Sequence, residues 1–515
     1  MQGRIIDISM KKIKSQLGIG VLITYFSIGV NIAAGLLYTP WMINQIGKND
    51  YGLYTLVNSL ITMFLMDFGL SSATARYVAK YRSENKEEEL EKFLSMVYKL
   101  YILIDAVIML ILILVFFCID IIYQNFTPEE LYKFKIIYGI AGVYSVCSFP
   151  CITFNGILNA YEKFIPLKLT DLFQKLCCVL FTIIALCLNG GLYALVVVNA
   201  VSGLVANIIK FFFVNQNIKV RRKRIEVAER KAYFKAIFSF SLWSTIWALS
   251  QRLIFNITPT LLGIVVVNAT AAISVFGIIT TIEGYFHIIT TAINGMFLSR
   301  ITRILNHETG DEELNRLAVK VGRFQFALNG LLILGFCLIG KEFIKLWVGE
   351  NFVEAYYGII LIVIPGAFYN TLQILHTTIV VKNLVKYQAY IQIVVGIVNV
   401  ICSLILSHHM GALGASISIC VTYFLRLILT ILFIKRKLCF DLKSFIKKCY
   451  IQTGIPVVIS FVIGFWVMSA IEGATWLSLI LKIILTVFIY IISILLMGLS
   501  QDERKALYKK INKDA

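Results

Sequence analysis

Charged side chains stand inside long apolar stretches of this sequence, and they are the residues best suited to chemistry. Arg252 lies midway along an apolar stretch at 236–262, and Glu283 midway along the next one at 268–298. A guanidinium in such a place can bind a phosphate or diphosphate by two parallel charge-assisted hydrogen bonds. An internal salt bridge to Glu283 is the equally weighted alternative. The two interpretations are compatible if Arg252 exchanges Glu283 for an anionic ligand.

Carboxylates occupy several apolar stretches as well. A charge within hydrocarbon is costly, so such a group usually faces a wet cavity or a partner. A buried carboxylate with a raised pKa can take up and release a proton, and could couple the protein to a proton or sodium gradient. The candidates for coupling, or for lining a cavity, are Asp67, Asp105, Asp171 and Glu283.

Lys175 is the second candidate cation. It stands four residues after Asp171, so on a helix the two side chains face one another, and we favour a structural pair over a ligand site. Lys210, Arg426 and Lys482 lie nearer the ends of apolar stretches. Extension of these side chains to the membrane interface explains them better than a function does.

Two prolines stand at matching places near the ends of apolar stretches. Pro40 and Pro259 each remove a backbone hydrogen bond and are expected to kink a helix. Such kinks either act as hinges during a conformational change or are static. We weight the two alternatives equally.

No pattern of metal-ligating, nucleotide-binding or catalytic residues is present. Cys147 and Cys151 stand four residues apart, but no histidine or carboxylate joins them at ligand spacing. The run at 335–341 has the glycines and lysine of a phosphate-binding loop, but it lacks the following Ser or Thr and a preceding strand. The sequence therefore predicts a protein that is not an enzyme and that has no metal and no cofactor.

The apolar stretches that must position these residues are long enough to cross a membrane. Of 515 residues, 59% are hydrophobic and only 15% are charged, which is outside the range of an average soluble domain. A stretch of about 20 apolar residues crosses the roughly 30 Å of hydrocarbon as a helix. About fourteen such stretches fit into the chain, which predicts an all-α integral membrane protein.

Basic residues follow the predicted topology and account for the net charge of +19. About 37 Lys and Arg fall on the side of the N-terminus and about 5 on the other side, so the positive-inside rule puts both termini in the cytoplasm. The charge is spread over short loops, so nucleic-acid binding is not predicted. The basic loop at 215–235 either anchors the topology, which we favour, or docks to anionic lipid or a partner.

Similarity at an offset of about 219 to 226 residues divides the chain into two halves. Thr39-Pro40 matches Thr258-Pro259, and the segment at 191–195 matches the one at 412–416. Two repeats of six helices enter the membrane from the same side, so an axis along the membrane normal relates them. We predict two six-helix lobes around a central cavity plus a C-terminal helix pair. The predicted parts are an N-lobe at 1–214, a basic cytoplasmic linker at 215–235, a C-lobe at 236–434, a terminal helix pair at 435–498 and a cytoplasmic tail at 499–515.

Three motifs give the sequence its resemblance to a known family. They are Ile46-Gly47-Lys48-Asn49-Asp50-Tyr51-Gly52-Leu53-Tyr54, Asp67-Phe68-Gly69-Leu70-Ser71-Ser72-Ala73 and Leu346-Trp347-Val348-Gly349. The chain resembles the polysaccharide transporters, or Wzx-type oligosaccharide-lipid flippases, of the multidrug/oligosaccharidyl-lipid/polysaccharide exporter superfamily. The resemblance implies a protein of the bacterial cytoplasmic membrane that moves an undecaprenyl-diphosphate-linked oligosaccharide to the outer leaflet by alternating access. Such movement serves the synthesis of surface polysaccharide such as O-antigen or capsule.

The resemblance also suggests roles for the candidate residues. Arg252, helped by Lys175, would bind the diphosphate, and Trp243 and Trp247 could stack on sugar rings, although packing between helices is favoured for the two tryptophans. The implied partners are the lipid-linked oligosaccharide, membrane lipids and a glycan polymerase or another assembly protein. The alternative is a cation-coupled exporter of drugs or other small molecules from the same superfamily. Arg252 argues against it, because sodium-coupled drug exporters tend to carry an acidic residue in that helix.

Overall fold

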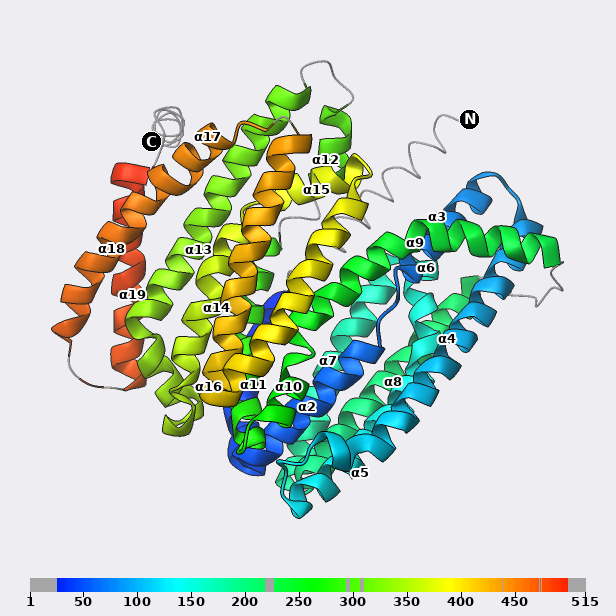
Figure 1. Ribbon diagram of the computed structural model, residues 1–515, viewed down its shortest axis with the longest axis horizontal. Helices are drawn as coiled ribbons and strands as arrows, with labels where there is room; N and C mark the ends of the chain where they lie inside the picture. The colour runs from blue at the N-terminus through cyan, green and yellow to red at the C-terminus, as the bar shows by residue number, and fades with distance from the viewer. Residues whose placement is uncertain are drawn as a thin grey trace. The chain divides into compact units, whose positions relative to one another are not determined.

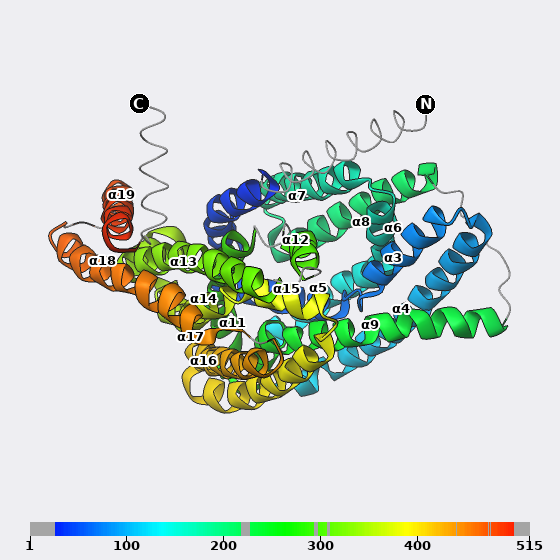
Figure 2. The same ribbon diagram turned by 90° about the horizontal axis from the view of Figure 1, so that it is seen from above.

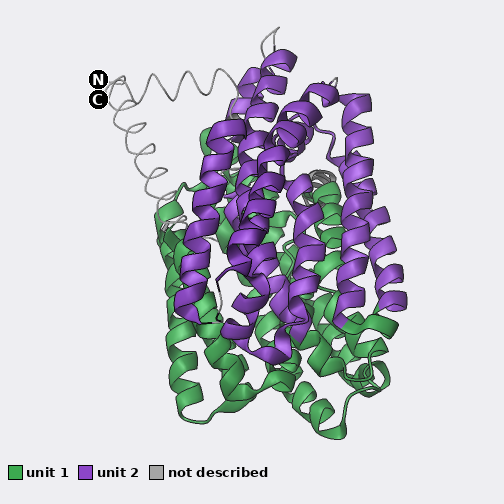
Figure 3. Cartoon of the chain, turned by 90° about the vertical axis from the view of Figure 1, so that its left-hand side faces the viewer, with its two compact units in different colours: residues 1–274, 407–411 green, residues 275–406, 412–515 purple. Residues whose placement is uncertain are grey.

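The computed structural model describes residues 26–217, 227–292, 297–305, 310–438, 440–471, 473 and 475–498. These residues are almost entirely helical and include no β-strand, so the all-α prediction is confirmed. The chain divides into two compact units (Figure 3). Unit 1 comprises residues 1–274 and 407–411, and unit 2 comprises residues 275–406 and 412–515.

Unit 1 consists of helices, most of which follow one another closely along the chain (Figure 1). In chain order they are Phe26–Ile46, α2 (Lys48–Phe64), α3 (Leu70–Ser83), α4 (Glu87–Ile122), α5 (Pro128–Ser148), a 3₁₀ turn (Phe149–Ile152), α6 (Thr153–Ala160), α7 (Phe164–Cys187), α8 (Gly191–Asn217), α9 (Val227–Phe255) and α10 (Thr258–Val265). Helix α11 (Ala269–Thr291) begins in unit 1 and continues into unit 2.

The helices of unit 2 include the longest ones of the chain. They are α12 (Phe297–Ile304), α13 (Gly310–Val348), a 3₁₀ turn (Glu350–Phe352), α14 (Ala355–Asn370), α15 (Gln373–Val381), α16 (Val385–Lys437), α17 (Leu442–Phe445), a π-helical segment (Ile446–Ile451), α18 (Gln452–Ser469), α19 (Trp476–Ser493) and a second π-helical segment (Ile494–Gly498). Helix α16 contains two helices that meet at Gly411, where φ is 53°.

Helix length and composition support repeated membrane crossing. Within the described ranges, nine helices are long and apolar enough to cross a bilayer, and two bent helix pairs raise this number to eleven. The prediction of a multi-pass membrane protein is therefore confirmed, whereas the count of fourteen is not. One reason is that the span predicted at 51–75 is interrupted between α2 and α3.

The same order of elements occurs twice along the chain. The long helices α4 and α13 both begin with three acidic residues, which interact favourably with a helix N-terminus. An interrupted pair follows each of them, α5 with α6 and α14 with α15. A residue with left-handed backbone then precedes the last two helices, Glu162 at φ 57° and Asn383 at φ 56°. The compact units do not follow this order throughout, because α9 and α10 group with unit 1.

The terminal pair, α18 and α19, packs against α13 (Figure 1). Nζ of Lys482 on α19 lies 2.8 Å from both carboxylate oxygens of Glu342 on α13. The hydroxyl of Tyr490 donates to the carbonyl of Ala327 at 2.6 Å. Polar contacts thus reinforce the apolar packing of this pair on unit 2.

Candidate functional site

A break between α2 and α3 replaces the continuous helix predicted at 51–75. Phe68 and Gly69 have left-handed backbone, with φ of 51° and 67°, which a right-handed helix cannot include. Asp67 lies in this break, and its Oδ1 accepts a hydrogen bond from the backbone N–H of Gly69 at 2.8 Å. Asp67 therefore stabilises a turn, as a short acidic side chain commonly does.

Side chains of α9 satisfy carbonyl groups that the break leaves without helical partners. The hydroxyl of Thr245 donates to the carbonyl of Phe68. Nη1 of Arg252 donates to the carbonyl of Thr62, in the last turn of α2. Backbone polar groups at membrane depth need such partners, because lipid offers none.

The Thr62 carbonyl is a partner of Arg252 that neither interpretation of the sequence named. Glu283 belongs to unit 2, whereas Arg252 and Thr62 both belong to unit 1. Asp67 is the carboxylate whose charge acts on Arg252. A guanidinium carries five N–H donors, so its bond to Thr62 leaves others for an anion.

One stripe of α7 faces away from the lipid. Exposed apolar side chains recur at helical spacing on the lipid-facing side of α7, namely Leu169, Phe173, Leu176, Leu180 and Ile184. Asp171, Lys175, Cys178 and Thr182 recur at the same spacing on the opposite side of the helix. Lys175 is exposed although it lies on this second stripe. Lys175 therefore lies on the side of α7 opposite to the exposed apolar residues.

The predicted pairing of Asp171 with Lys175 is wrong. Oδ1 of Asp171 lies 2.8 Å from Nζ of Lys210 on α8, and α7 and α8 pack side by side (Figure 2). Lys175 has no ion-pair partner within the described part of the chain. Among the described residues, no carboxylate thus pairs with Lys175, whereas Asp171 neutralises the charge of Lys210.

The three cations predicted to extend to the interface are buried instead. Lys210 is 7% exposed, and Arg426 and Lys482 are 3% exposed. Each is held by a side chain from another helix, Lys210 by Asp171 and Lys482 by Glu342. The prediction is wrong because nearness to a helix end does not reveal which neighbouring helix covers the side chain.

Tyrosine and amide side chains from three helices meet in unit 1. The hydroxyl of Tyr54 on α2 accepts a hydrogen bond from Nδ2 of Asn199 on α8 at 3.3 Å, and another from the amide of Asn58. Tyr38, in the helix Phe26–Ile46, is hydrogen-bonded to Thr182 on α7. We call Tyr38, Tyr54, Asn58 and Asn199 the tyrosine–amide cluster. All four of its residues are partly exposed.

A second polar cluster surrounds Arg426 in unit 2. The guanidinium lies over the ring of Tyr369, 3.8 Å from the ring centroid. With its amide oxygen turned toward Arg426, Gln392 accepts hydrogen bonds from Nε at 2.7 Å and from Nη2 at 3.0 Å. Glu283 is hydrogen-bonded to Tyr423, and the charge of Arg426 acts on it. Glu283 therefore belongs to a network within unit 2.

Histidines extend the cluster around Arg426. Nδ1 of His376 and Nε2 of Gln388 lie 2.6 Å apart, while the buried Nε2 of His376 has no hydrogen-bond partner within the part of the chain that the structure describes. His287 is hydrogen-bonded to Asn370. Buried networks of this kind define how the helices that carry them pack.

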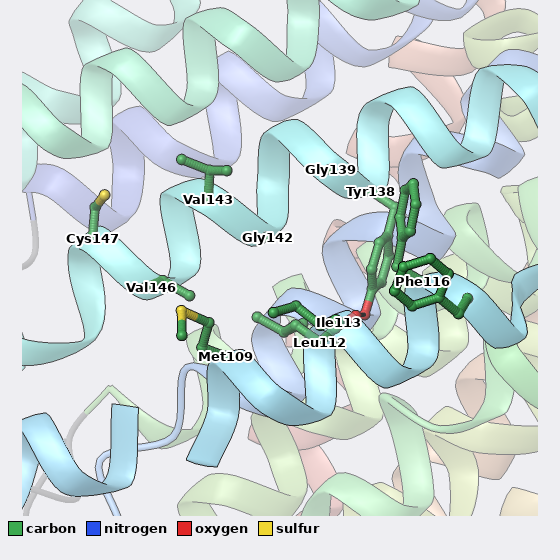
Figure 4. Close-up of a pocket in the computed structure, with 11 residues that line it drawn as sticks. Met109, Leu112, Ile113, Phe116, Tyr138, Gly139, Gly142, Val143, Val146 and Cys147 are labelled. Carbon is green, nitrogen blue, oxygen red and sulfur yellow. Dashed lines mark hydrogen bonds between the residues drawn. The ribbon is translucent and has the colours of Figure 1, made fainter. Parts of the chain in front are cut away.

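Asp105 differs from the other predicted carboxylates. Among the described residues its Oδ1 is buried without a hydrogen-bond partner. One turn further along α4, Met109 begins an apolar groove of about 440 Å³ between α4 and α5 (Figure 4). A Cβ at Gly139 or Gly142 would meet nothing within 4 Å, so the space beside both glycines is open. Val143 at its rim is 67% exposed, so the groove belongs to the lipid-facing surface.

The remaining predicted residues lie on the helix Phe26–Ile46 and on α9 and α10. Pro40 stands within a helix without a break, whereas Pro259 is the second residue of α10 and lies at a bend of 40° between α9 and α10. Trp243 is partly exposed and Trp247 is 36% exposed. The described ranges hold no group of three or more His, Cys, Asp or Glu residues suited to a metal ion.

Charges held inside an all-helical, multi-pass fold are typical of membrane transporters. Residues 17–299 match the family described as polysaccharide biosynthesis protein, and the chain belongs to this family. No curated protein sequence matches the chain.

Solved structures share the fold. One is the lipid II flippase MurJ in an inward closed conformation, with a TM-score of 0.73 and 14% identity over 92% of this chain and 97% of that one. Another is an inward-facing multidrug resistance MATE family transporter of the MOP superfamily, with a TM-score of 0.68 and 12% identity over 81% of this chain and 98% of that one. At such identities the likeness concerns the fold alone. It agrees with the all-helical membrane fold that the sequence predicts.

Proposed function

We propose that this chain is a flippase that moves an undecaprenyl-diphosphate-linked oligosaccharide from the cytoplasmic to the outer leaflet of the bacterial cytoplasmic membrane. Membership of a polysaccharide biosynthesis family supports this proposal, as does the fold shared with MurJ and MATE transporters. The observation that carries it is the placement of two cations in unit 1, Arg252 and Lys175.

The two cations lie at a similar depth. Thr62, the contact of Arg252, stands about 21 Å from the start of α2, and Lys175 stands about 18 Å from the end of α7, at 1.5 Å per residue. The start of α2 and the end of α7 share one end of the unit, because the hydrogen bond between Tyr54 and Asn199 ties α2 to α8, which follows α7. Two cations at one depth suit a diphosphate, which carries at least two negative charges.

Alternating access would present this cation pair first to the cytoplasm, where both termini lie, and then to the outside. A proton or sodium gradient would supply the direction. Among the four candidate carboxylates, Asp171 is neutralised by Lys210 and Asp67 stabilises a turn. Asp105, with its unpartnered buried oxygen, fits proton uptake better than these two, and Glu283 would act within unit 2.

Other predicted roles remain part of the proposal. Trp243 and Trp247 on α9 would contact sugar rings beyond the one nearest the diphosphate, and Pro259 would bend the α9–α10 pair during transport. The released substrate would pass to a glycan polymerase or another assembly protein.

Lys175→Ala is the cleanest test, because Lys175 has no ion-pair partner to disturb within the described residues. We expect glycan export to fall by about 10- to 100-fold, the equivalent of one charge-assisted hydrogen bond. Arg252→Lys keeps the positive charge but loses the two parallel hydrogen bonds that a guanidinium donates to a phosphate. Glycan export by this variant should therefore also fall. Export is measured as surface glycan at matched protein levels in the membrane.

Lys320→Ala, an exposed residue of α13, is the matched control and should export normally. Accumulation of the lipid-linked oligosaccharide in the inner leaflet should accompany every loss of export. Wild-type export by Lys175→Ala together with Arg252→Ala would contradict the proposed function of the pair.

The alternative is an exporter of cationic small molecules, which the similarity to a multidrug MATE transporter favours. Such a protein should confer resistance to cationic dyes and should depend on its carboxylates more than on Arg252. A resistance assay comparing Asp105→Asn with Arg252→Lys distinguishes the two functions.

A further inference from the structure

The tyrosine–amide cluster takes no part in the function proposed so far. Polar side chains inside a membrane helix bundle are costly unless they bind one another or a ligand. Hydrogen bonds from Asn58 and Asn199 both end on the hydroxyl of Tyr54. A hydroxyl oxygen that accepts two hydrogen bonds still has its O–H to donate. The cluster is thus partly satisfied internally and keeps polar capacity for a ligand.

The cluster faces the interior of unit 1 and not the lipid. On α8 the exposed apolar side chains recur at helical spacing, namely Val197, Val201, Val205, Ile208 and Phe212. Asn199 stands on the side of α8 opposite to them, as Lys175 does on α7. Partial exposure on such a face leaves these side chains within reach of a ligand on the inner side of α8.

The cluster also lies on one side of the two cations. Tyr54 stands about 12 Å along α2 from Thr62, the residue that Arg252 contacts, at 1.5 Å per residue. Thr182, the partner of Tyr38, stands about 10 Å along α7 from Lys175. In both cases the cluster is nearer the end of the unit where α2 begins. A ligand with its diphosphate at the cations could place its next group at the cluster.

Aromatic rings together with amides match the surface of a sugar. A sugar ring has apolar C–H faces that pack on an aromatic ring, and hydroxyl groups at its edge that exchange hydrogen bonds with amides. Neutral donors and acceptors of this kind suit hydroxyls better than they suit a phosphate, which prefers cations. The cluster therefore offers the neutral groups that suit a sugar, whereas the cation pair offers the positive charges that suit a diphosphate.

We propose that Tyr38, Tyr54, Asn58 and Asn199 form a subsite for the sugar nearest the diphosphate of the substrate. The inference rests on the proposed flippase function and deepens it. The cation pair supplies affinity for any polyprenyl diphosphate, and the cluster distinguishes a glycosylated lipid from a bare one.

Binding of two probes to the purified full chain tests this subsite. The probes are undecaprenyl diphosphate and undecaprenyl-diphosphate-linked oligosaccharide extracted from source cells that lack the protein, with Kd measured by quenching of tryptophan fluorescence. The wild-type protein should bind the glycosylated lipid more tightly. Tyr54→Phe and Asn199→Ala should each reduce this preference by about 5- to 10-fold, since each removes a neutral hydrogen-bonding group. Binding of the bare lipid should stay unchanged, which also shows that the variants are folded.

Two controls separate the possible results. Tyr132→Phe changes a tyrosine that is 67% exposed on α5 and should keep the full preference. Arg252→Lys should weaken binding of both lipids equally. If the wild-type protein prefers the glycosylated lipid and both cluster variants keep that preference, the subsite is overturned while the flippase function stands. If the wild-type protein binds neither lipid, the flippase function fails and the subsite fails with it.

Discussion

At the scale of single residues, burial distinguishes cations that hold the protein together from one that is available to a ligand. Lys210, Arg426 and Lys482 are covered and paired, whereas Lys175 is exposed on the side of α7 away from the lipid. A buried charge whose partner is removed is strongly destabilising. Substitution of the paired cations should therefore affect stability first, and substitution of Lys175 should affect transport first.

Arg426→Ala tests this distinction in unit 2. Removal of the guanidinium leaves Gln392 and Glu283 without the group that faces them, so we expect a loss of about 3–5 kcal/mol in the free energy of unfolding. Thermal unfolding in detergent measures it. Arg316→Ala is the control, because the Arg316 side chain is 84% exposed. This variant should leave the midpoint of thermal unfolding unchanged. Arg426→Ala with full stability and no transport would instead place Arg426 in a ligand site.

At the scale of elements, the break between α2 and α3 determines where Arg252 lies. The break frees carbonyl groups near the end of α2, and α9 supplies the side chains that bind them. Gly69 is the residue on which this geometry depends, because its φ of 67° is unfavourable for any residue with a Cβ. A Cβ at this position would also approach Oγ of Ser244 to 2.5 Å.

Gly69→Ala should destabilise the protein by about 1–2 kcal/mol, the cost of a left-handed residue with a side chain. When Gly69→Ala is combined with Ser244→Ala, the protein should recover only the part of its stability that was lost through the close contact between the new Cβ and Oγ of Ser244. Gly139→Ala is the matched control, since a Cβ there meets nothing within 4 Å. Unfolding midpoints in detergent decide the outcome, and equal midpoints for Gly69→Ala and Gly139→Ala would contradict the role of the break.

At the scale of the whole molecule, α18 and α19 are an addition bound to unit 2 through α13. The buried ion pair between Lys482 and Glu342 is the polar part of this attachment. As part of the proposed flippase function, this pair of helices would extend a groove for the lipid tail of the substrate. The packing adds a structural role, because Glu342 depends on α19 for its partner.

Truncation after Lys448 separates the two roles. Without α19, Glu342 loses its cation and the truncated chain should be less stable; Glu342→Gln in the truncated chain should restore part of that stability, since a neutral amide is cheaper to leave unpaired than a carboxylate. Export of surface glycan by the stabilised truncated chain is the second measurement. Normal export would show that the two helices do not hold the lipid tail.

Composition and periodicity by themselves determined the membrane class, the all-helical fold and the repeated order of elements. These properties depend on contiguous windows of sequence, in which apolar length alone decides whether a helix can cross a bilayer. The positions of charges inside those windows also identified Arg252, Lys175 and Glu283 as residues that need a partner.

Only the tertiary structure decided which partners these charges have. Asp171 pairs with Lys210 and not with Lys175, because α8 packs closely on α7 and brings its own cation into reach. The tyrosine–amide cluster needs side chains from three helices, and its one local signal is the spacing of Tyr54 and Asn58, one turn apart in an apolar helix. Pairing across helices depends on which faces meet and at what depth, and the amino-acid sequence of one helix does not contain that information.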